Sequence, residues 1–404
     1  MTGRLLRLDV ENFRTLRKVS VPLGPLTVLV GPNGVGKSNV LKVFDFLTDI
    51  IQTDLEPALE ARGGFDEVAF WGGGKRPPTT MSIGLQALWT THASPSAPDE
   101  YELTIRRRAV PGRPDGAYTL SRSEKFQFKR TRGRGRRIAI SGEQATVVET
   151  HATEDAEESQ FGIQRLSSGL STLPRLARTE GGAEVSRVAE RLSSFRVFDV
   201  DVRAARRPSR VATMGQHLEP DAGNLADFLL DLREQDVQNW QRLLEDVKTV
   251  LPHLEDIEFG SAGSAIDEVT VYLRERGLRR GTPLADASFG TVRLLGLLAL
   301  LYDPNPPALT CVEEIDHGLH PQALELLVDR LREASTRSQF LVATHSPALV
   351  DRLRPEEFVV CERDRLGASV IPAISTEQIR AIVEESEDLP LGELWFSGAL
   401  GGDL

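Results

Sequence analysis

The sequence predicts an α/β fold in which both ends of the chain build one mixed-sheet lobe and the middle of the chain inserts a mainly helical lobe. Near the N-terminus, the strand-like run "LTVLV" leads directly into a glycine-rich loop and then into apolar residues at helical spacing. In residues 183–253, apolar residues recur every three or four positions, which is typical of helices. From residue 287 onward, helix and strand patterns alternate. We therefore expect three segments, 1–150, 151–285 and 286–404, of which the first and third share the mixed-sheet lobe.

The composition is that of a globular protein with an acidic balance. The chain has 404 residues, of which 40% are hydrophobic, so it can bury substantial cores. Its formal net charge of −11 argues against a generally basic nucleic-acid-binding protein. Any contact with DNA must therefore be local.

Cysteine usage and hydropathy predict a cytoplasmic location. Cys311 and Cys361 each lie in an apolar run, so we expect core residues in a reducing compartment, and no disulfide framework or cysteine metal site. The most apolar segment, residues 292–302, has about half the length of a membrane span. The start of the chain lacks the apolar run and cleavage site of a signal peptide. We expect no membrane partner.

The first segment reads as strands. "RLLRLDVENF" and "VSVPLGPLTVLV" are apolar or alternating runs separated by Gly and Pro. Residues 81–148 contain short alternating runs between charged and Gly-rich stretches, which predicts an antiparallel sheet with long hairpins. The basic run "KRTRGRGRR", residues 129–137, is too polar to pack, and we expect an exposed hairpin tip there.

The later segments contain helices and a second set of strands. Residues 151–285 read as a mainly helical lobe that ends in a strand pair, "EVTVYLRERG". After it, "VRLLGLLALLY", "ALTCV", "PQALELLVDRLREAS" and "FLVAT" alternate as helix, strand, helix and strand.

A phosphate-binding motif stands between the first apolar strand and the first helix. Gly31 to Ser38, "GPNGVGKS", matches G-x-x-x-x-G-K-[ST] in the strand–loop–helix context that the motif requires. Successive backbone N–H groups of such a loop point at phosphate oxygens, and side chains at the glycine positions would block the approach. Lys37 would reach the β and γ phosphates, and Ser38 would supply a hydroxyl to Mg²⁺. A glycine-rich turn without nucleotide is the alternative.

Two adjacent carboxylates end a later apolar strand, in "VEEIDHGLHP". Beside Mg-ATP, Glu313 would hold the metal through water, and Glu314 would orient and deprotonate the attacking water. Just ahead of this strand, in "DASFGTVRLLGLLALL", Ser288 and Gly290 begin an apolar helix, so that a hydroxyl and free N–H groups face outward at its positive end. A solvated strand end and an ordinary N-cap are the alternatives for the two segments taken singly.

The order of these motifs distinguishes the classes of nucleotide-binding protein. A GTPase would carry an Asn-Lys-x-Asp motif, which the sequence lacks. RecA-like and AAA+ motors place their carboxylate strand nearer to the phosphate loop. A long separation, with a serine-glycine helix start before the carboxylates, is the order of ABC-type ATPases. In that context His345, in "FLVATHSPAL", is a candidate γ-phosphate contact, and a structural histidine is the alternative.

The chain resembles the RecF/SMC-related ABC-type ATPases of the AAA group that also includes the ATPase part of overcome-lysogenization-defect (OLD) nucleases. The residues that carry the resemblance are "ENFRTL", "GPNGVGKSNVLK", "LEPDAGNLADFLLDL", "SFGTVRLLGLLALL", "VEEIDHGLHPQAL", "ATHSPALVD" and "LGELWFSGALGG", which span nearly the full chain. OLD nucleases add a TOPRIM nuclease domain. The segment after His345 lacks its Glu plus Asp-x-Asp set, so we expect no nuclease activity.

The resemblance implies a role for each matching position. The expected phosphate and metal contacts are Asn33, Gly34, Gly36, Lys37 and Ser38, with Asn39 adjacent and Arg14 near the nucleotide. The expected signature that closes on ATP of a second subunit is Ser288 with Gly290. The remaining positions are Glu313 as the Walker B residue, Glu314 as the catalytic base, Asp316 in a dimer-contacting loop and His345 as the switch histidine. For the metal-binding glutamine, both Gln160 and Gln164 are candidates.

Two positions depart from the pattern of this group. The signature "ASFGT" lacks the second glycine of transporters and SMC proteins, and Glu313 stands where Asp is commoner. The longer side chain can alter the Mg²⁺ geometry, so the expected turnover is slow or partner-dependent.

The expected function is that of an ATPase that converts ATP and water to ADP and phosphate and forms a homodimer around two Mg-ATP molecules. The dimer would pass a conformational change to double-stranded DNA, through residues 129–137 and 203–210, or to a separately encoded effector, in DNA repair or phage defence. Solvated loops are the alternative for the two basic segments. A nucleotide-gated scaffold or sensor with little hydrolysis is the alternative function, and a transporter subunit is disfavoured by the signature.

Overall fold

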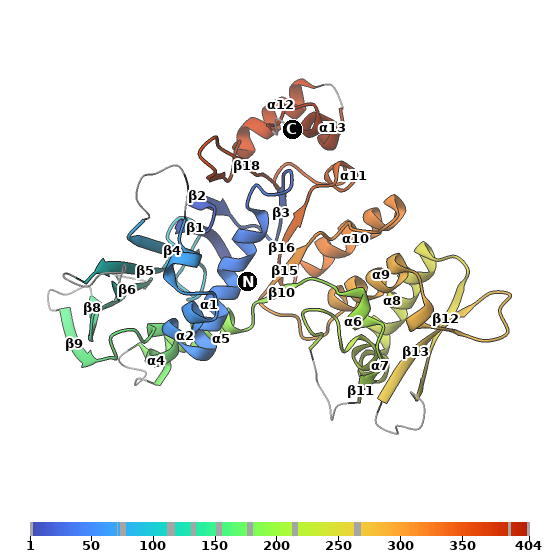
Figure 1. The fold of residues 1–404 in the computed structure, drawn as a ribbon, viewed down its shortest axis with the longest axis horizontal. Helices are drawn as coiled ribbons and strands as arrows, with labels where there is room; N and C mark the ends of the chain where they lie inside the picture. Colours follow the sequence, from blue (N-terminus) through green and yellow to red (C-terminus); the bar gives the residue numbers. More distant parts are fainter. Residues whose placement is uncertain are drawn as a thin grey trace.

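A five-stranded parallel sheet lies at the centre of the protein (Figure 1). The computed structural model describes residues 3–70, 72, 78–110, 118–130, 135–150, 156–175, 181–211, 217–261, 268–386 and 389–401. In spatial order the strands of the central sheet are β10 (Arg196–Phe198), β15 (Leu309–Glu313), β16 (Gln339–Thr344), β3 (Leu26–Val30) and β17 (Phe358–Val360). Because all neighbours are parallel, their carboxyl ends share one edge of the sheet.

The two faces of the central sheet belong to two separate hydrophobic cores. Along β3, Val28 and Val30 pack into one core and Leu29 into the other. Along β16, Val342 and Leu341 divide in the same way. Such alternation follows from the period of two of a β-strand, and it explains why these strands are apolar throughout: both faces are covered.

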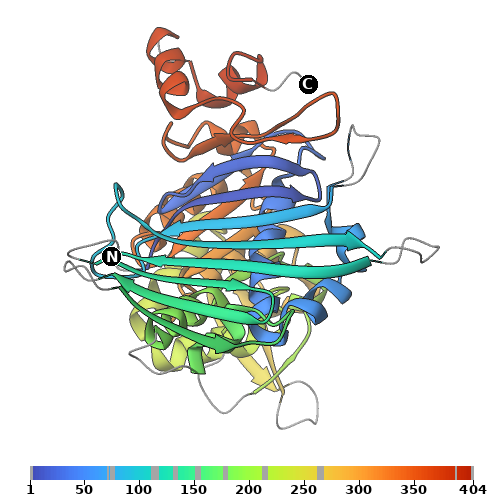
Figure 2. The ribbon, with the colours of Figure 1, turned by 90° about the vertical axis from the view of Figure 1, so that its left-hand side faces the viewer.

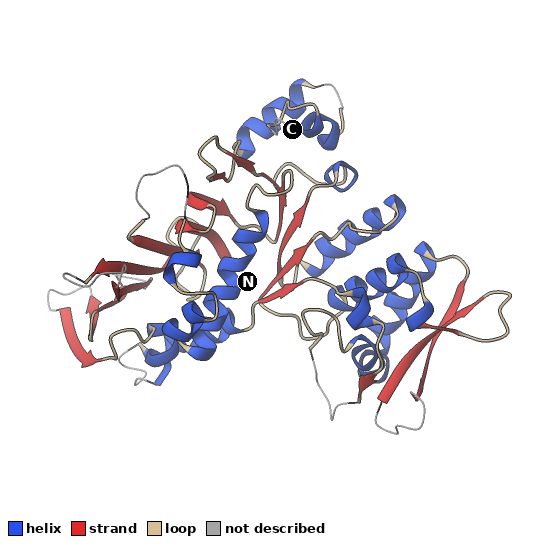
Figure 3. Ribbon diagram, in the orientation of Figure 1, coloured by secondary structure: helices blue, strands red, loops and turns tan. Residues whose placement is uncertain are grey.

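Helices cover both faces of this sheet (Figure 3). The core that contains Leu29 is built with α1 (Lys37–Thr53), α2 (Leu55–Glu60), α4 (Gly169–Thr172) and α5 (Gly182–Ser193). The core that contains Val28 is built with α7 (Leu225–Gln235), α8 (Val237–Val250), α9 (Phe289–Leu301), α10 (Pro321–Ala334), α11 (Pro347–Val350) and α13 (Leu391–Phe396). Helix α9 is buried almost all round, because it lies between the sheet and its neighbouring helices.

An eight-stranded antiparallel sheet covers the outer side of α1 and α5 (Figure 2). Its spatial order is β2 (Leu16–Pro22), β1 (Leu5–Phe13), β4 (Thr80–Ala87), β5 (Asp99–Ala109), β6 (Tyr118–Phe128), β7 (Gly135–Ser141), β8 (Gln144–Thr150) and β9 (Ala156–Gly162). The hairpins predicted for residues 81–148 are therefore confirmed. The expected segment boundary at residue 150 falls inside this sheet, between the paired strands β8 and β9.

Two further groups of elements lie at the lower right and at the top of Figure 1. Beside α7 and α8, the segment "EVTVYLRERG" forms one strand, β13 (Glu268–Glu275), and not the whole of the predicted strand pair. Strand β13 pairs with β12 (Leu254–Ser261), β11 (Ser209–Arg210) and β14 (Thr282–Pro283). After β17, the chain forms the hairpin of β18 (Glu362–Arg363) and β19 (Ser369–Val370), followed by α12 (Thr376–Glu385) and α13. Short helical turns complete the description: α3 (Phe65–Val68), η1 (Leu173–Arg175), α6 (Val202–Ala205) and η3 (Leu284–Asp286).

Cys311 and Cys361 are both free and buried, as predicted for core residues. Burial raises the pKa of each thiol, and that of Cys361 reaches about 12. Neither thiol is therefore ionised near neutral pH. Within the described ranges, no helix combines the length and the apolar character that crossing a membrane requires.

The basic run at residues 129–137 connects the paired strands β6 and β7, and the prediction that its side chains are exposed is wrong for Arg136. That side chain is only 6% exposed and donates to Glu184 Oε2 at 2.8 Å and to Glu149. Arg130 contacts the same two carboxylates. The two glutamates come from β8 and α5. The positive charges of Arg130 and Arg136, which the sequence predicted to be exposed, are therefore partly neutralised by carboxylates from other elements. Arg132 and Arg134 lie outside the described residues.

Replacing Arg136 by Ala is expected to lower the free energy of unfolding by about 3 kcal/mol, because Glu184 would keep its burial and lose a charged partner. Arg137, the next residue, is exposed and donates to Gln127, so Arg137→Ala should cost less than about 0.5 kcal/mol. Urea unfolding of both variants measures the difference. Equal losses would show that the ion pairs of Arg136 contribute nothing beyond a surface contact.

Candidate functional site

The phosphate-loop motif occupies the edge of the central sheet where β3 ends and α1 begins. Gly34 and Gly36 have φ values of +81° and +108°, a region that side chains disfavour. A Cβ at Gly36 would overlap the hydroxyl of Ser369. Helix α1 has no side-chain cap at its start, so its first N–H groups remain available to an anion.

Lys37 lies folded back over this loop. Its Nζ donates to the carbonyl oxygens of Gly31 at 2.7 Å and Pro32 at 2.9 Å, and the residue is 8% exposed. Burial lowers the pKa of Lys37, and the negative charges of nearby groups, Glu314 among them, oppose that shift. The ammonium group therefore lies over the loop, where phosphate oxygens could replace the two carbonyl oxygens as its hydrogen-bond acceptors.

Ser38 and Glu313 meet across the sheet although they are 275 positions apart in the chain. The Ser38 hydroxyl donates to Glu313 Oε2 at 2.8 Å. Ser38 belongs to the first turn of α1, and Glu313 is the last residue of β15. One strand, β16, lies between β15 and β3, so the two side chains converge from strands that do not pair.

Glu314 follows in a conformation that the fold imposes. Its φ is +46°, which is uncommon for a residue with a side chain, and its N–H donates to Ala343 O at 3.0 Å. Arg293, from the middle of α9, donates to the carbonyl oxygens of Glu313 at 3.3 Å and Glu314 at 2.7 Å. The backbone on both sides of the strand end is thus fixed, while the Glu314 carboxylate is exposed, 3.9 Å from His317 Nδ1.

His345 and Asp316 stand beside these carboxylates. His345 is exposed directly after β16, two residues beyond Ala343, which is the register partner of Glu313. Thr344 donates from its hydroxyl to Asp316 Oδ1 and accepts from Ser346 N–H at 3.0 Å. The loop after Glu314 and the turn after β16 are therefore tied together at the same sheet edge.

Ser288 and Gly290 lie against the loop that follows Glu314. Ser288 caps α9 by accepting from Thr291 N–H at 3.1 Å, and its side chain is exposed. A Cβ at Gly290 would be 2.7 Å from Gly318 O, so only glycine allows this approach. Phe289 is 41% exposed and its ring centroid lies 5.3 Å from that of His317. Ser288 and Phe289 are thus exposed, while Gly290 packs against the loop that follows Glu314.

Arg14 and Asn39 lie on the other side of the phosphate loop, near the turn between β1 and β2. Asn39 Nδ2 donates to Thr15 Oγ1 at 2.8 Å. Arg14 has φ +49°, its N–H donates to Val68 O at 2.7 Å, and its buried Nε has no hydrogen-bond partner. A buried donor without a partner is costly unless a ligand or water completes it.

Gln160 and Gln164 lie near the junction of β9 and α4. Gln160 is exposed on β9 and donates to Glu158, while the carbonyl oxygen of Gln164 accepts from buried Arg122 at 3.0 Å. Neither contact involves a residue of the phosphate loop, and the choice between the two stays open.

Several residues of this region had no signal in the sequence. Thr15 and Arg293 lie inside the quoted segments "ENFRTL" and "SFGTVRLLGLLALL", but no pattern assigned either of them a role. Arg363 and Ser369 belong to no quoted segment. All four reach the site through contacts with residues far along the chain. Thr344, directly before His345, likewise lies in a quoted segment, "ATHSPALVD".

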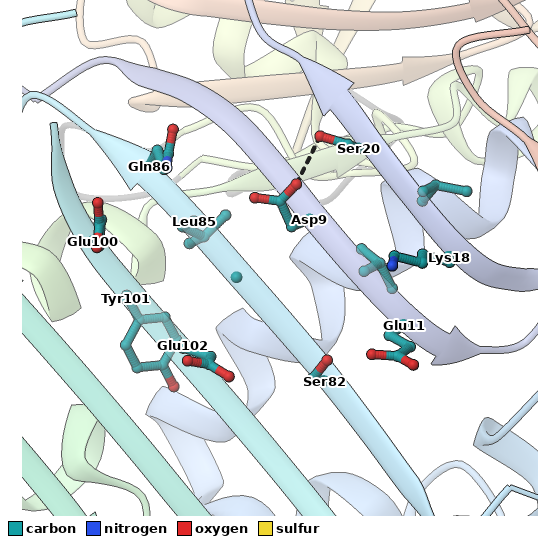
Figure 4. A pocket seen from close by; sticks show the side chains of 13 residues that line it. Asp9, Glu11, Lys18, Ser20, Ser82, Leu85, Gln86, Glu100, Tyr101 and Glu102 are labelled. Carbon is teal, nitrogen blue, oxygen red and sulfur yellow. Dashed lines mark hydrogen bonds between the residues drawn. The ribbon is translucent and has the colours of Figure 1, made fainter. Parts of the chain in front are cut away.

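A separate hollow of about 560 Å³ lies on the outer face of β1, β2, β4 and β5 (Figure 4). Four carboxylates line it, from Asp9, Glu11, Glu100 and Glu102, and Asp9 accepts from Ser20 Oγ at 2.6 Å. Negative charge disfavours phosphate binding, so this hollow does not compete with the phosphate loop as a nucleotide site.

The residues at the loop fit Mg-ATP. The glycine positions leave room for phosphates, Lys37 is a buried cation held only by carbonyl groups, and Ser38 and Glu313 bring together a hydroxyl and a carboxylate oxygen. Oxygen donors are the ligands that Mg²⁺ prefers, and it is usually bound by one or two carboxylates plus substrate phosphates. This donor set supports a divalent cation beside a polyphosphate.

The parallel sheet, the phosphate loop and the distant carboxylate pair define a P-loop ATPase of the ABC type. A family model described as "AAA domain, putative AbiEii toxin, Type IV TA system" matches residues 26–351. The chain belongs to this AAA family.

Curated relatives match over short stretches. The OLD nuclease of Thermus scotoductus is 46% identical over 57 residues, 14% of this chain and 10% of that protein. The Old nuclease of Escherichia phage P2 is 43% identical over 49 residues, 12% and 8% of the two chains. Structural maintenance of chromosomes protein 1 of Schizosaccharomyces pombe is 42% identical over 55 residues, 13% and 4%. The chain thus spans a tenth or less of the length of these relatives.

Solved SMC heads are similar at low sequence identity. The SMC head domain from Thermotoga maritima has 16% identity and a TM-score of 0.44, over 92% of this chain and 99% of that chain. An SmcHead bound to the C-winged helix domain of ScpA has 15% identity and a TM-score of 0.48, over 93% and 99%. The family assignment rests on the family model.

Replacing Gly36 by Ala is expected to destabilise the fold more than the same change at Gly142. Both glycines have positive φ, +108° and +59°, but a Cβ at Gly142 would meet nothing within 4 Å, whereas one at Gly36 would overlap Ser369. Gly142→Ala should cost about 1 kcal/mol and Gly36→Ala at least about 1 kcal/mol more. Denaturant unfolding compares the two, and equal costs would mean that the loop has room to move away from Ser369.

Proposed function

We propose that the chain binds Mg-ATP at the phosphate loop and hydrolyses it to ADP and phosphate. The observation that carries this proposal is the 2.8 Å hydrogen bond from Ser38 to Glu313, because it brings the metal-binding ends of two separate motifs to one point. Glu314 is the next residue, and its carboxylate is exposed. A bound Mg²⁺ would supply positive charge against the phosphate oxygens and would offset the repulsion between the two adjacent glutamates.

Each side chain then has a separate task. Lys37 exchanges its carbonyl partners for β- and γ-phosphate oxygens, and the N–H groups of the loop and of α1 bind the same anion. Glu314 accepts the proton of the attacking water, and His345 contacts the γ-phosphate from the end of β16. Arg293 holds the backbone of Glu314 in the left-handed conformation, which a glutamate rarely adopts by itself. This contact therefore also fixes the direction from which the Glu314 carboxylate leaves the backbone.

We further propose that two copies close around two ATP molecules. Ser288 and Gly290 of one copy would contact the γ-phosphate held by the other, with Asp316 in the adjoining loop. The exposure of Ser288 and of the neighbouring Phe289 ring supports this, since both face away from the core of their own chain. ATP would close the dimer and hydrolysis would open it.

The proposed output is a conformational change passed to double-stranded DNA or to a separately encoded effector, in DNA repair or phage defence. Arg203, Arg207 and Arg210 are exposed around α6 and β11, where they could neutralise phosphates. Arg206 of the same segment donates to Ala287 O, directly before the signature serine. A ligand bound at this segment would therefore be connected, through Arg206 and Ala287, to Ser288 in the proposed dimer contact.

Replacing Glu314 by Gln is expected to lower steady-state phosphate release at least about 100-fold while ATP binding persists, because the amide cannot accept the proton. Phosphate release is measured with Mg-ATP, with and without linear duplex DNA. If the wild type hydrolyses ATP and the variant does so equally well, Glu314 is not the base. If both bind ATP and neither hydrolyses it, the chain serves as a nucleotide-gated scaffold.

Replacing Ser288 by Arg is expected to abolish the ATP-dependent dimer without weakening ATP binding by the monomer, because a bulky cation would occupy the proposed contact. Light scattering on the Glu314→Gln background, with and without Mg-ATP, reports the mass. Gln241→Arg places the same charge at an exposed position on α8 and serves as the control. A Ser288→Arg protein that still dimerises with ATP would contradict the proposed interface.

A further inference from the structure

The hairpin of β18 and β19 lies directly against the phosphate loop, although it follows the loop by more than three hundred residues (Figure 1). Strand β17 pairs with β3 as far as the start of the loop, and Cys361 N–H donates to Val30 O at 2.7 Å. A Cβ at Gly31 would overlap Cys361 O. The chain that enters the hairpin therefore runs in contact with the first residue of the loop.

The second strand of the hairpin contacts the end of the loop. Ser369 N–H donates to Thr15 O at 2.8 Å, and the two hydroxyl groups are 2.7 Å apart. Thr15 Oγ1 also accepts from Asn39 Nδ2, in the first turn of α1. Gly36 lies against the Ser369 hydroxyl, so that a Cβ at this position would force one of the two to shift. The hairpin is thus fixed on both sides of the loop.

The turn of the hairpin is rigid in its own right. Asp364 Oδ1 accepts from the N–H groups of Leu366 and Ala368, each at 2.8 Å, and Asp364 N–H donates to Ala368 O at 2.8 Å. An aspartate that bonds the backbone two residues later is a common way to stabilise a tight turn. Arg363 therefore projects from a well-defined support.

Arg363 joins this support to the middle of the phosphate loop. Its Nε donates to Gly367 O at 3.1 Å within the turn, and its Nη1 donates to Gly34 O at 3.3 Å. Gly34 has φ +81° and no neighbour within 4 Å of its missing Cβ, so nothing else constrains it on that side. Because glycine has more backbone freedom than other residues, the contact with Arg363 restrains the direction of its carbonyl group.

The direction of that carbonyl also sets the direction of a donor. The peptide between Gly34 and Val35 is planar and trans, so the Gly34 C=O and the Val35 N–H point to opposite sides of it. With the carbonyl group bound to Arg363, the N–H faces away from the hairpin. In a phosphate loop that N–H is one of the groups that contact the ligand.

We propose that Arg363 is a positioning residue of the nucleotide site, which fixes the Gly34–Val35 peptide so that the Val35 N–H points at the bound phosphates. This inference rests on the proposed function, because it deepens the description of the same site. The guanidinium acts through the loop backbone and does not need to touch the nucleotide. Loss of the contact lets the peptide rotate and removes one charge-assisted hydrogen bond to phosphate.

The test compares Arg363→Ala with Arg365→Ala by calorimetric titration with ATP and with ADP, both in the presence of Mg²⁺. Arg365 is an exposed arginine of the same turn and controls for the loss of one positive charge near an anionic ligand. Arg363→Ala should weaken the binding of both nucleotides about tenfold, whereas Arg365→Ala should change it less than about twofold. Arg363→Lys should restore part of the affinity, since an ammonium group can still donate to Gly34 O.

Four results would overturn the inference. The first is an Arg363→Ala protein that binds both nucleotides as tightly as the wild type. The second is an Arg365→Ala protein that loses as much affinity for the nucleotides as Arg363→Ala does. A loss for ATP alone would identify a direct γ-phosphate contact instead of a fixed loop. A parallel fall in the melting temperature of the nucleotide-free protein would identify a structural role. A wild type that binds neither nucleotide would refute the proposed function itself, and this outcome is seen before any variant is compared.

Discussion

The hydrogen bond between Ser38 and Glu313 is the contact on which the rest of the site depends. It joins the first turn of α1 to the end of β15, and these elements lie on opposite sides of the intervening strand β16. The two side chains can meet because β3 and β15 run in the same direction and end at the same edge of the sheet. The two hydrophobic cores keep that sheet flanked on both faces, so the fold serves chiefly to hold two short polar segments at one place.

Around this contact, two arginine side chains bind backbone carbonyl groups and so hold the backbone of the site in place. Arg293 binds the carbonyl groups of Glu313 and Glu314, and Arg363 binds the carbonyl of Gly34. Arg293 comes from helix α9, whose first residues are the proposed dimer contact, and Arg363 comes from the β18–β19 hairpin. A movement of either segment would therefore reach the phosphate loop or the carboxylates directly, which gives a physical route from a dimer contact or a partner to the nucleotide.

The sequence could predict what depends on short, local patterns. The phosphate loop and the glutamate pair are such patterns, and the alternation of apolar strands and helices indicated the α/β fold. The sequence predicted one mixed-sheet lobe, whereas the structure has a parallel sheet and a separate antiparallel sheet. The sequence could not show that Arg136 is neutralised by glutamates of other elements, that an arginine in an apolar helix binds the strand end, or that Ser369 closes over Gly36. These contacts depend on long-range packing, and a charged or small residue has the same appearance in the sequence whether it is solvated or paired.

The most direct test of the central claim is a crystal structure of the Glu314→Gln protein grown with ATP and Mn²⁺, in which anomalous scattering locates the metal. The account predicts one manganese ion per chain beside Ser38 Oγ and the Glu313 carboxylate, with the ATP phosphates along the loop from Gly31 to Lys37. Manganese at any other place, or nucleotide bound away from this loop with the Ser38–Glu313 hydrogen bond intact, would contradict it.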